Sequence, residues 1–172
     1  MVETERLYLR PFEPGDAEAY AAIRSRPSNA RYLPGGEAGA TDAAIRARAV
    51  ATPWGSEAWT AGGFAPWAVV EKTSARLIGH LGVRYLPEID ETELLYLIDE
   101  PWWGKGLATE AGHAAVRFAR ERLGVRYLVA FILPENVRSI SVVRKLGFRQ
   151  DGEQSIFGLD VLRFALPLTA GA

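Results

Sequence analysis

Between Glu93 and Glu110 the chain passes from an apolar strand pattern into a glycine-containing loop and then directly into a helical pattern. Gly104 and Gly106 lie in this loop, and glycine lets a backbone approach a ligand closely. The first amides of a helix lack partners within the helix and lie at the positive end of its dipole, so a diphosphate fits there. Lys105 adds a cation at the rim. The pattern predicts an anion site, or else a tight turn that simply needs glycine.

The segments around this junction predict a mixed α/β fold. Period-two alternation and apolar runs favour strands, and apolar residues at helical spacing favour helices. Strands are predicted over residues 7–10, 67–71, 76–86, 93–98, 126–133 and 156–166, the second to fourth forming an antiparallel meander. Helices are predicted over residues 17–26 with Asp16 as cap, 41–51, 106–123 ended by Gly124, and 137–146 with Asn136 as cap. The apolar run in 126–133 is typical of a strand buried on both faces beside a parallel neighbour.

Length and composition limit the possible domain organisation and function of the chain. With 172 residues, of which 48% are hydrophobic, we expect one domain over residues 1–172. The formal net charge of -1 offers no basic field for nucleic acid or an anionic membrane. No cysteine is present and the two histidines lack metal-ligand spacing, so no metal site is expected. The N-terminus shows no signal-peptide pattern and no long apolar run occurs, which favours a cytoplasmic protein.

Two familiar phosphate-binding patterns fit the glycine loop poorly. The Gly-x-x-x-x-Gly-Lys-Ser/Thr loop of nucleotide hydrolases is absent. The dinucleotide fingerprint fits in part, because Thr109 stands where its third glycine belongs and no carboxylate follows at the end of the next strand. Nucleotide hydrolysis and NAD binding are therefore disfavoured.

Three stretches of the chain resemble the GNAT superfamily of N-acetyltransferases, and within it the RimJ/RimL-like branch that acetylates protein N-termini. They are residues 4–11 followed by Asp16-Ala17, residues 103–111, and residues 134–139 running on to 145–148. The resemblance covers almost the whole chain. It implies a single-domain α/β fold with a splayed mixed sheet of six to seven strands and about four helices, and acetyl-CoA as the cofactor.

The resemblance also implies where the cofactor binds. The pyrophosphate pattern falls on residues 103–108, with Trp103 in place of the usual arginine or glutamine, and the pantetheine arm pairs like a strand with residues 96–98. Asn136 would contact the pantetheine as well as cap its helix. The predicted cofactor-binding residues are Tyr96, Leu97, Ile98, Trp103, Gly104, Lys105, Gly106, Leu107, Ala108, Thr109, Asn136 and Ser139. The basic residues that could meet the adenosine phosphates are Lys105, Arg138, Arg144 and Lys145.

Acetyl transfer to an amine needs a neutral nucleophile, and therefore a base near the acceptor. Glu93 is the candidate, because it matches the glutamate that starts the fourth strand in similar sequences; Glu91, His80 or water could do the same work. The leaving thiolate needs a proton donor, but Val143 stands where many relatives carry a tyrosine. Ser139 matches a serine proposed for this role in the RimL-like branch. Glu93 can also be read as a solvated strand residue, and Ser139 as a residue that satisfies helix amides.

The acceptor is the least specified part of the prediction. Trp54 and Trp59, in the glycine-rich segment 52–66, could wall the acceptor pocket together with His80. An α-amine costs roughly 1 kcal/mol to deprotonate at pH 7, and a lysine about 4 to 5 kcal/mol, so an α-amine needs less assistance. A protein or peptide N-terminus is the favoured acceptor. A small-molecule amine or antibiotic is the alternative among enzymes, an acyl-CoA-binding module without turnover is the alternative of another class, and the chain can be a monomer or a homodimer.

Overall fold

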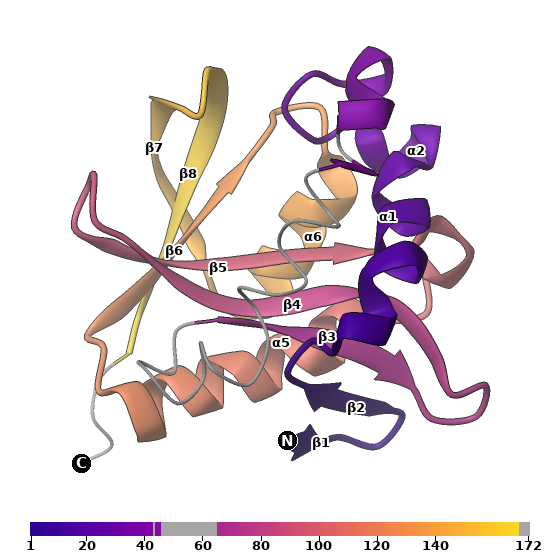
Figure 1. Cartoon of the computed structure of the whole chain (residues 1–172). Helices are drawn as coiled ribbons and strands as arrows, with labels where there is room; N and C mark the ends of the chain where they lie inside the picture. The colour runs from indigo at the N-terminus through magenta and orange to yellow at the C-terminus, as the bar shows by residue number, and fades with distance from the viewer. Residues whose placement is uncertain (43, 46–64, 169–172) are drawn as a thin grey trace.

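Eight strands form one open mixed sheet in the part of the chain that the structure, a computed structural model, describes: residues 1–42, 44–45 and 65–168 (Figure 1). The strands are β1 (Val2–Glu3), β2 (Leu7–Arg10), β3 (Pro66–Glu71), β4 (Arg76–Leu86), β5 (Glu91–Ile98), β6 (Tyr127–Ile132), β7 (Arg149–Ile156) and β8 (Leu159–Pro167). Their order is β1-β2-β3-β4-β5-β6-β8-β7. Every neighbouring pair is antiparallel except β5 and β6, which are parallel.

Helices begin and end at residues whose conformation suits a terminus. The α-helices are α1 (Ala17–Ser25), α2 (Pro27–Ala30), α5 (Leu107–Phe118) and α6 (Val137–Lys145), and residues 40–42 and 44–45 are also helical. Pro27 opens α2 directly after α1. A π-helical turn (Ala119–Leu123) extends α5 and ends at Gly124, whose φ of 63° lies in the left-handed region that glycine adopts without strain.

The helices cover both faces of the sheet. On β3, Trp67 and Val69 join the large hydrophobic cluster that contains the buried faces of α5 and α6. Ala68, which points to the other face, packs with Tyr20 of α1. This alternation is the period-two geometry of a strand, and it makes the central strands the wall between two different environments.

The predicted fold class is confirmed, with corrections in its details. The sheet has eight strands rather than six or seven, because β1 and the polar edge strand β7 escaped prediction. Asp16 precedes α1, but its side chain does not cap that helix; it accepts hydrogen bonds from Arg10 and from the Glu13 amide instead. Residues 46–51 of the predicted helix over 41–51 lie outside the described residues. No helix in the described residues is long and apolar enough to cross a membrane.

One glycine fixes the distance between the two strands next to the site. A Cβ at Gly79 on β4 would lie 1.9 Å from the carbonyl oxygen of Leu97 on β5, and the φ of this glycine is +150°. We expect Gly79→Ala to lower the free energy of unfolding by more than about 3 kcal/mol, since backbone atoms must move. The matched control is Gly152→Ala in β7, where a Cβ meets nothing within 4 Å. Chemical denaturation checks this prediction, and similar losses in the two variants would contradict it.

Candidate active site

The centre of the sheet opens where its one parallel pair separates. β5 pairs with β4 along its whole length, from Glu91 to Ile98, whereas its register with β6 consists of Glu93 opposite Val129. Beyond that point the edge of β5 has no strand partner among the described residues. The Ile98 carbonyl on this stretch accepts a hydrogen bond from the Trp103 indole at 2.5 Å. An unpaired strand edge can take up an extended ligand arm by main-chain hydrogen bonding.

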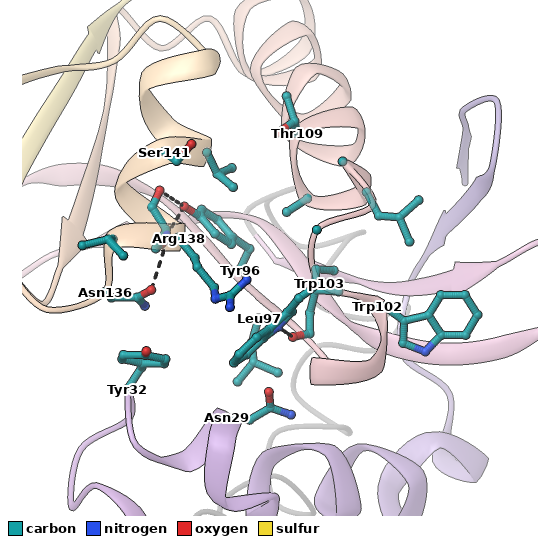
Figure 2. A pocket seen from close by; sticks show the side chains of 18 of the residues that line it. Asn29, Tyr32, Tyr96, Leu97, Trp102, Trp103, Thr109, Asn136, Arg138 and Ser141 are labelled. Atoms are coloured by element: carbon teal, nitrogen blue, oxygen red, sulfur yellow. Dashed lines mark hydrogen bonds between the residues drawn. The ribbon is translucent and has the colours of Figure 1, made fainter.

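A cavity of about 400 Å³ lies beside this edge (Figure 2). Its walls come from the C-terminal half of β5, the loop before α5 with the first turn of that helix, one side of α6 along its whole length, and α2 with the residues that follow it. Of the predicted cofactor-binding residues, all but Lys105 line it. The predicted residues thus come from three separate segments of the chain, and the fold brings them around one cavity.

The loop before α5 presents backbone amides to this cavity. Gly104 and Gly106 have φ values of 74° and 76°, and a Cβ at Gly104 would meet no protein atom within 4 Å. The first helical hydrogen bond runs from the Glu110 amide to the Gly106 carbonyl at 3.0 Å. The preceding amides, of residues 107–109, thus have no acceptor within the helix and lie at its positive end. These features fit a diphosphate.

A network from the N-terminal segment holds this loop in place. Glu110 accepts hydrogen bonds from the Arg6 amide at 2.8 Å, the Arg6 Nε at 2.7 Å and the Thr4 hydroxyl at 2.5 Å. The Arg6 guanidinium also donates to the Lys105 carbonyl at 2.9 Å. Burial raises the pKa of Glu110, but the bonds from Thr4 and Arg6 outweigh it and the net pKa is lowered. The N-terminal segment therefore shapes the loop without lining the cavity.

Two of the four predicted phosphate-binding cations lie at the cavity. Arg138 and Lys145 line it, and the Arg138 guanidinium lies 5.2 Å from the centroid of the Trp103 ring. Lys105 and Arg144 do not line it, and the Lys105 ammonium lies 4.5 Å from the centroid of the Trp102 ring. Both cations that line the cavity come from α6, so the positive charge faces the loop amides across the cavity.

A pair of hydroxyl groups bridges β5 and α6. The Tyr96 hydroxyl lies 2.7 Å from the Ser139 Oγ and donates to the Ser139 carbonyl at 3.0 Å (Figure 2). Asn136 caps α6 as predicted, because its Oδ1 accepts from the Ser139 amide at 3.1 Å. Burial raises the pKa of Tyr96, and the hydrogen bond from Ser139 opposes this less strongly. Val143, one turn further along α6, is fully buried in the core.

The predicted base lies on the other face of β5. Glu93 is 5% exposed, and its Oε2 lies 2.6 Å from the Nε of Arg84. Burial raises the pKa of Glu93, while the nearby Arg84 guanidinium lowers it, and the net pKa is raised. Glu93 does not line the cavity, so its role as a base remains a prediction. Glu91, on the same face two residues earlier, is paired with Arg163.

His80 is equally withdrawn from the cavity. It is 4% exposed, and its Nδ1 lies 2.8 Å from the Tyr20 hydroxyl. Burial, together with the charges of Arg24 and Arg84, holds the pKa of His80 well below its usual value, so this imidazole is neutral at pH 7. Its predicted contact with the acceptor remains a prediction. Trp54 and Trp59 lie outside the described residues.

The α2 wall of the cavity was missed from the sequence. Asn29, Tyr32 and Leu33 line the cavity, and Figure 2 shows Asn29 and Tyr32 on the side away from Ser141 of α6. Asp99, at the end of β5, holds this wall by accepting from Arg26 Nε at 2.8 Å and Asn29 Nδ2 at 2.8 Å. In sequence, Pro27 and its polar neighbours resemble a loop, and a contact that spans some 70 positions leaves no local pattern.

Comparison with known proteins defines the class and then the family. The fold is similar to that of an acetyltransferase in the Agrobacterium tumefaciens crystal structure, which is 26% identical over 96% of this chain and 92% of that chain, with a TM-score of 0.77. The family model described as "Acetyltransferase (GNAT) domain" matches residues 6–149. The chain belongs to the GNAT acetyltransferase family, and it is an N-acetyltransferase of that family.

Curated relatives agree with this family. An uncharacterized N-acetyltransferase, YnaD of Bacillus subtilis, is 27% identical over 152 residues, which are 88% of this chain and 84% of that protein. The alanine N-acetyltransferase of ribosomal protein uS5 from Escherichia coli is 37% identical over 57 residues, which are 33% of this chain and 29% of that protein. The second match is too short to assign an acceptor.

The Asp99 contacts generate a stability prediction. We expect Asp99→Ala to lower the free energy of unfolding by about 2 kcal/mol, because it leaves donors on Asn29 and the partly exposed Arg26 without an acceptor. The control is Glu37→Ala, which removes an ion pair with Arg31 whose two side chains are 52% and 54% exposed. That pair contributes at most about 1 kcal/mol. Urea unfolding of both variants checks the difference, and an equal loss would refute it.

Proposed function

We propose that this chain transfers the acetyl group of acetyl-CoA directly to the α-amine at the N-terminus of a protein or peptide. The observation that carries the proposal is the amide cradle at residues 104–109, which opens into the cavity beside the unpaired edge of β5. Family membership supports acetyl-CoA as the acetyl donor. The short match to a ribosomal-protein alanine N-acetyltransferase supports an N-terminal acceptor.

The cavity has groups for each part of acetyl-CoA. The amides of residues 107–109 would bind the diphosphate, with Arg138 and Lys145 adding positive charge. The free edge of β5 from Tyr96 to Ile98 would hold the pantetheine amides and leave a backbone donor for the thioester carbonyl. The thioester supplies an activated acetyl group, so the chain has to bind, align and move protons rather than form a covalent intermediate.

The acceptor amine has to lose a proton as it attacks. A free α-amine is a sizeable fraction neutral near pH 7, and its deprotonation costs roughly 1 kcal/mol, so a distant base suffices. Glu93 would accept this proton through water, because its carboxylate lies outside the cavity wall. Its raised pKa brings this carboxylate closer to neutral pH, which makes it a better proton acceptor.

A screen of acetylated products tests the proposed acceptor. The full-length protein is incubated with acetyl-CoA, a library of peptides with different N-terminal residues, and a set of small amines that includes aminoglycosides. Mass spectrometry should show acetyl groups on peptide N-termini. Exclusive acetylation of small amines or of lysine side chains would overturn the acceptor and leave the family assignment intact.

The amide cradle generates a binding prediction with a closely matched control. Gly104→Ala should weaken acetyl-CoA binding by at least about 10-fold, since the new methyl group lies where the ligand approaches the backbone. Gly158→Ala carries the same φ of +74° and the same open surroundings, but lies in the β7–β8 turn. Both should lose about 1 to 2 kcal/mol of stability from left-handed strain. Calorimetric titration that shows equal affinities for the two variants would contradict the cradle.

The Glu93–Arg84 pair generates a pH prediction. A base must be deprotonated, so kcat/KM should rise with pH through the raised pKa of Glu93, above the ordinary glutamate value. Because Arg84 lowers that pKa, Arg84→Gln should move the rise to higher pH. The acceptor α-amine has a pKa near 8, so its own titration adds a separate rise at higher pH.

Glu93→Gln provides the control for this profile. It should abolish the acid limb of the profile, which is the rise of kcat/KM with pH through the pKa of Glu93. Acetyl-CoA affinity should stay unchanged, since Glu93 does not line the cavity. An acid limb that survives in Glu93→Gln would move the base to Glu91, His80 or solvent.

A further inference from the structure

One donor order satisfies both contacts of the hydroxyl pair between β5 and α6. When the Tyr96 hydroxyl donates its one hydrogen to the Ser139 carbonyl, 3.0 Å away, the 2.7 Å contact between the two hydroxyl groups is a donation from Ser139 to Tyr96. In this arrangement the serine hydrogen is directed at the tyrosine and not at the cavity. Ser139 donates to the Tyr96 phenol, and the phenol is the last donor of the pair.

Breaking the hydrogen bond from the Tyr96 hydroxyl to the Ser139 carbonyl costs little free energy. The Ser139 carbonyl lies within α6, where a carbonyl is paired with the amide four residues later. Donation from Tyr96 is therefore a second bond to that oxygen. When the phenolic hydrogen turns toward the cavity, no buried group is left without a partner, and Ser139 still donates to the phenol oxygen.

The two hydroxyl groups differ as acids. A phenol has a pKa near 10 and a free thiol a pKa near 8.5, whereas an aliphatic hydroxyl is a far weaker acid than either. Burial raises the pKa of Tyr96, so its proton is present throughout the neutral range. Val143, one turn from Ser139 on α6, has no proton to give. On chemical grounds the phenol is the stronger donor of the pair.

We propose that Tyr96 is the proton donor to the coenzyme A thiolate and that Ser139 is a positioning residue that holds and stabilises the phenol. This proposal rests on the proposed transfer of acetyl from acetyl-CoA. When the tetrahedral adduct collapses, the carbon–sulfur bond breaks and its electron pair stays on sulfur. The Tyr96 proton moves to that sulfur, and the phenolate accepts the Ser139 hydrogen bond. The proton released by the amine returns through water to Tyr96, so the exchange is balanced.

Site-directed variants separate the two roles. Tyr96→Phe keeps the ring and should lower kcat by about 100-fold, the low end for loss of a general acid, with little change in KM for acetyl-CoA. Ser139→Ala should lower kcat by about 10-fold or less. The double variant should be no slower than Tyr96→Phe alone, because Ser139 acts through Tyr96. Tyr85→Phe, which removes a hydroxyl bonded to Asp90 at an exposed position, is the control and should leave kcat unchanged.

Tyrosine analogues of graded acidity at position 96 give a measurement that would not change if Tyr96 had only a structural role. Fluorinated tyrosines at position 96 keep the shape of the ring while lowering the pKa of the phenol, and log kcat should change in proportion to that pKa. A kcat that does not depend on the pKa, a Ser139→Ala loss as large as that of Tyr96→Phe, or multiplicative losses in the double variant would each overturn the proposal.

The choice of acceptor in the assay distinguishes failure of the proposed function from failure of the Tyr96 proposal. All variants are assayed with whichever amine the wild-type protein acetylates, whether it is a peptide or a small molecule. An unexpected acceptor then refutes the proposed function alone, and a wrong pattern among the Tyr96 and Ser139 variants refutes this inference alone.

Discussion

The structure depends on the short length over which β5 and β6 pair. A parallel strand pair buried between helices ordinarily continues for several residues, but here the register is limited to Glu93 opposite Val129. Antiparallel partners on the outer sides, β4 and β8, hold each strand in the sheet while the inner edges separate. Without those partners the open edges would be a liability, since unpaired strand edges invite association. The opening is thus supported from both sides and remains available to a ligand.

Distant segments keep the opening in shape. The first residues of the chain reach the start of α5 through Arg6 and Glu110, and Asp99 joins the end of β5 to α2 through Arg26 and Asn29. Both networks place a carboxylate next to a backbone turn and surround it with donors. A cavity built from loops alone would be mobile, whereas these contacts tie each wall to a strand or a long helix. The amide cradle is therefore held from outside the cavity by Arg6 and Glu110.

Local patterns in the sequence predicted the parts of the site that local physics determines. The glycines at 104 and 106 and the Asn136 cap depend on a few neighbouring residues, and the structure shows the backbone conformations and the cap bond that the sequence predicts. The partners of Glu93 and Tyr96 were not predictable in this way. Arg84 meets Glu93 across two strands, and Ser139 meets Tyr96 over 43 positions, so only the fold decides these pairs. The polar strand β7 escaped because its mostly exposed residues lack apolar alternation.

The alternation of side chains along β5 places the proposed base, Glu93, and the proposed acid, Tyr96, on opposite faces of one strand. Glu93 and Tyr96 are three positions apart, an odd number, so Glu93 points with Arg84 to one face while Tyr96 points to α6 on the other. For both proposed roles to hold, a thioester at the strand edge would present its carbonyl carbon toward the Glu93 face and its sulfur toward the Tyr96 face. An amine that attacked from the Glu93 side would then expel the thiolate toward the Tyr96 side. In that arrangement the base and the acid would not compete for the same space, and the proton taken from the amine would return through water to Tyr96.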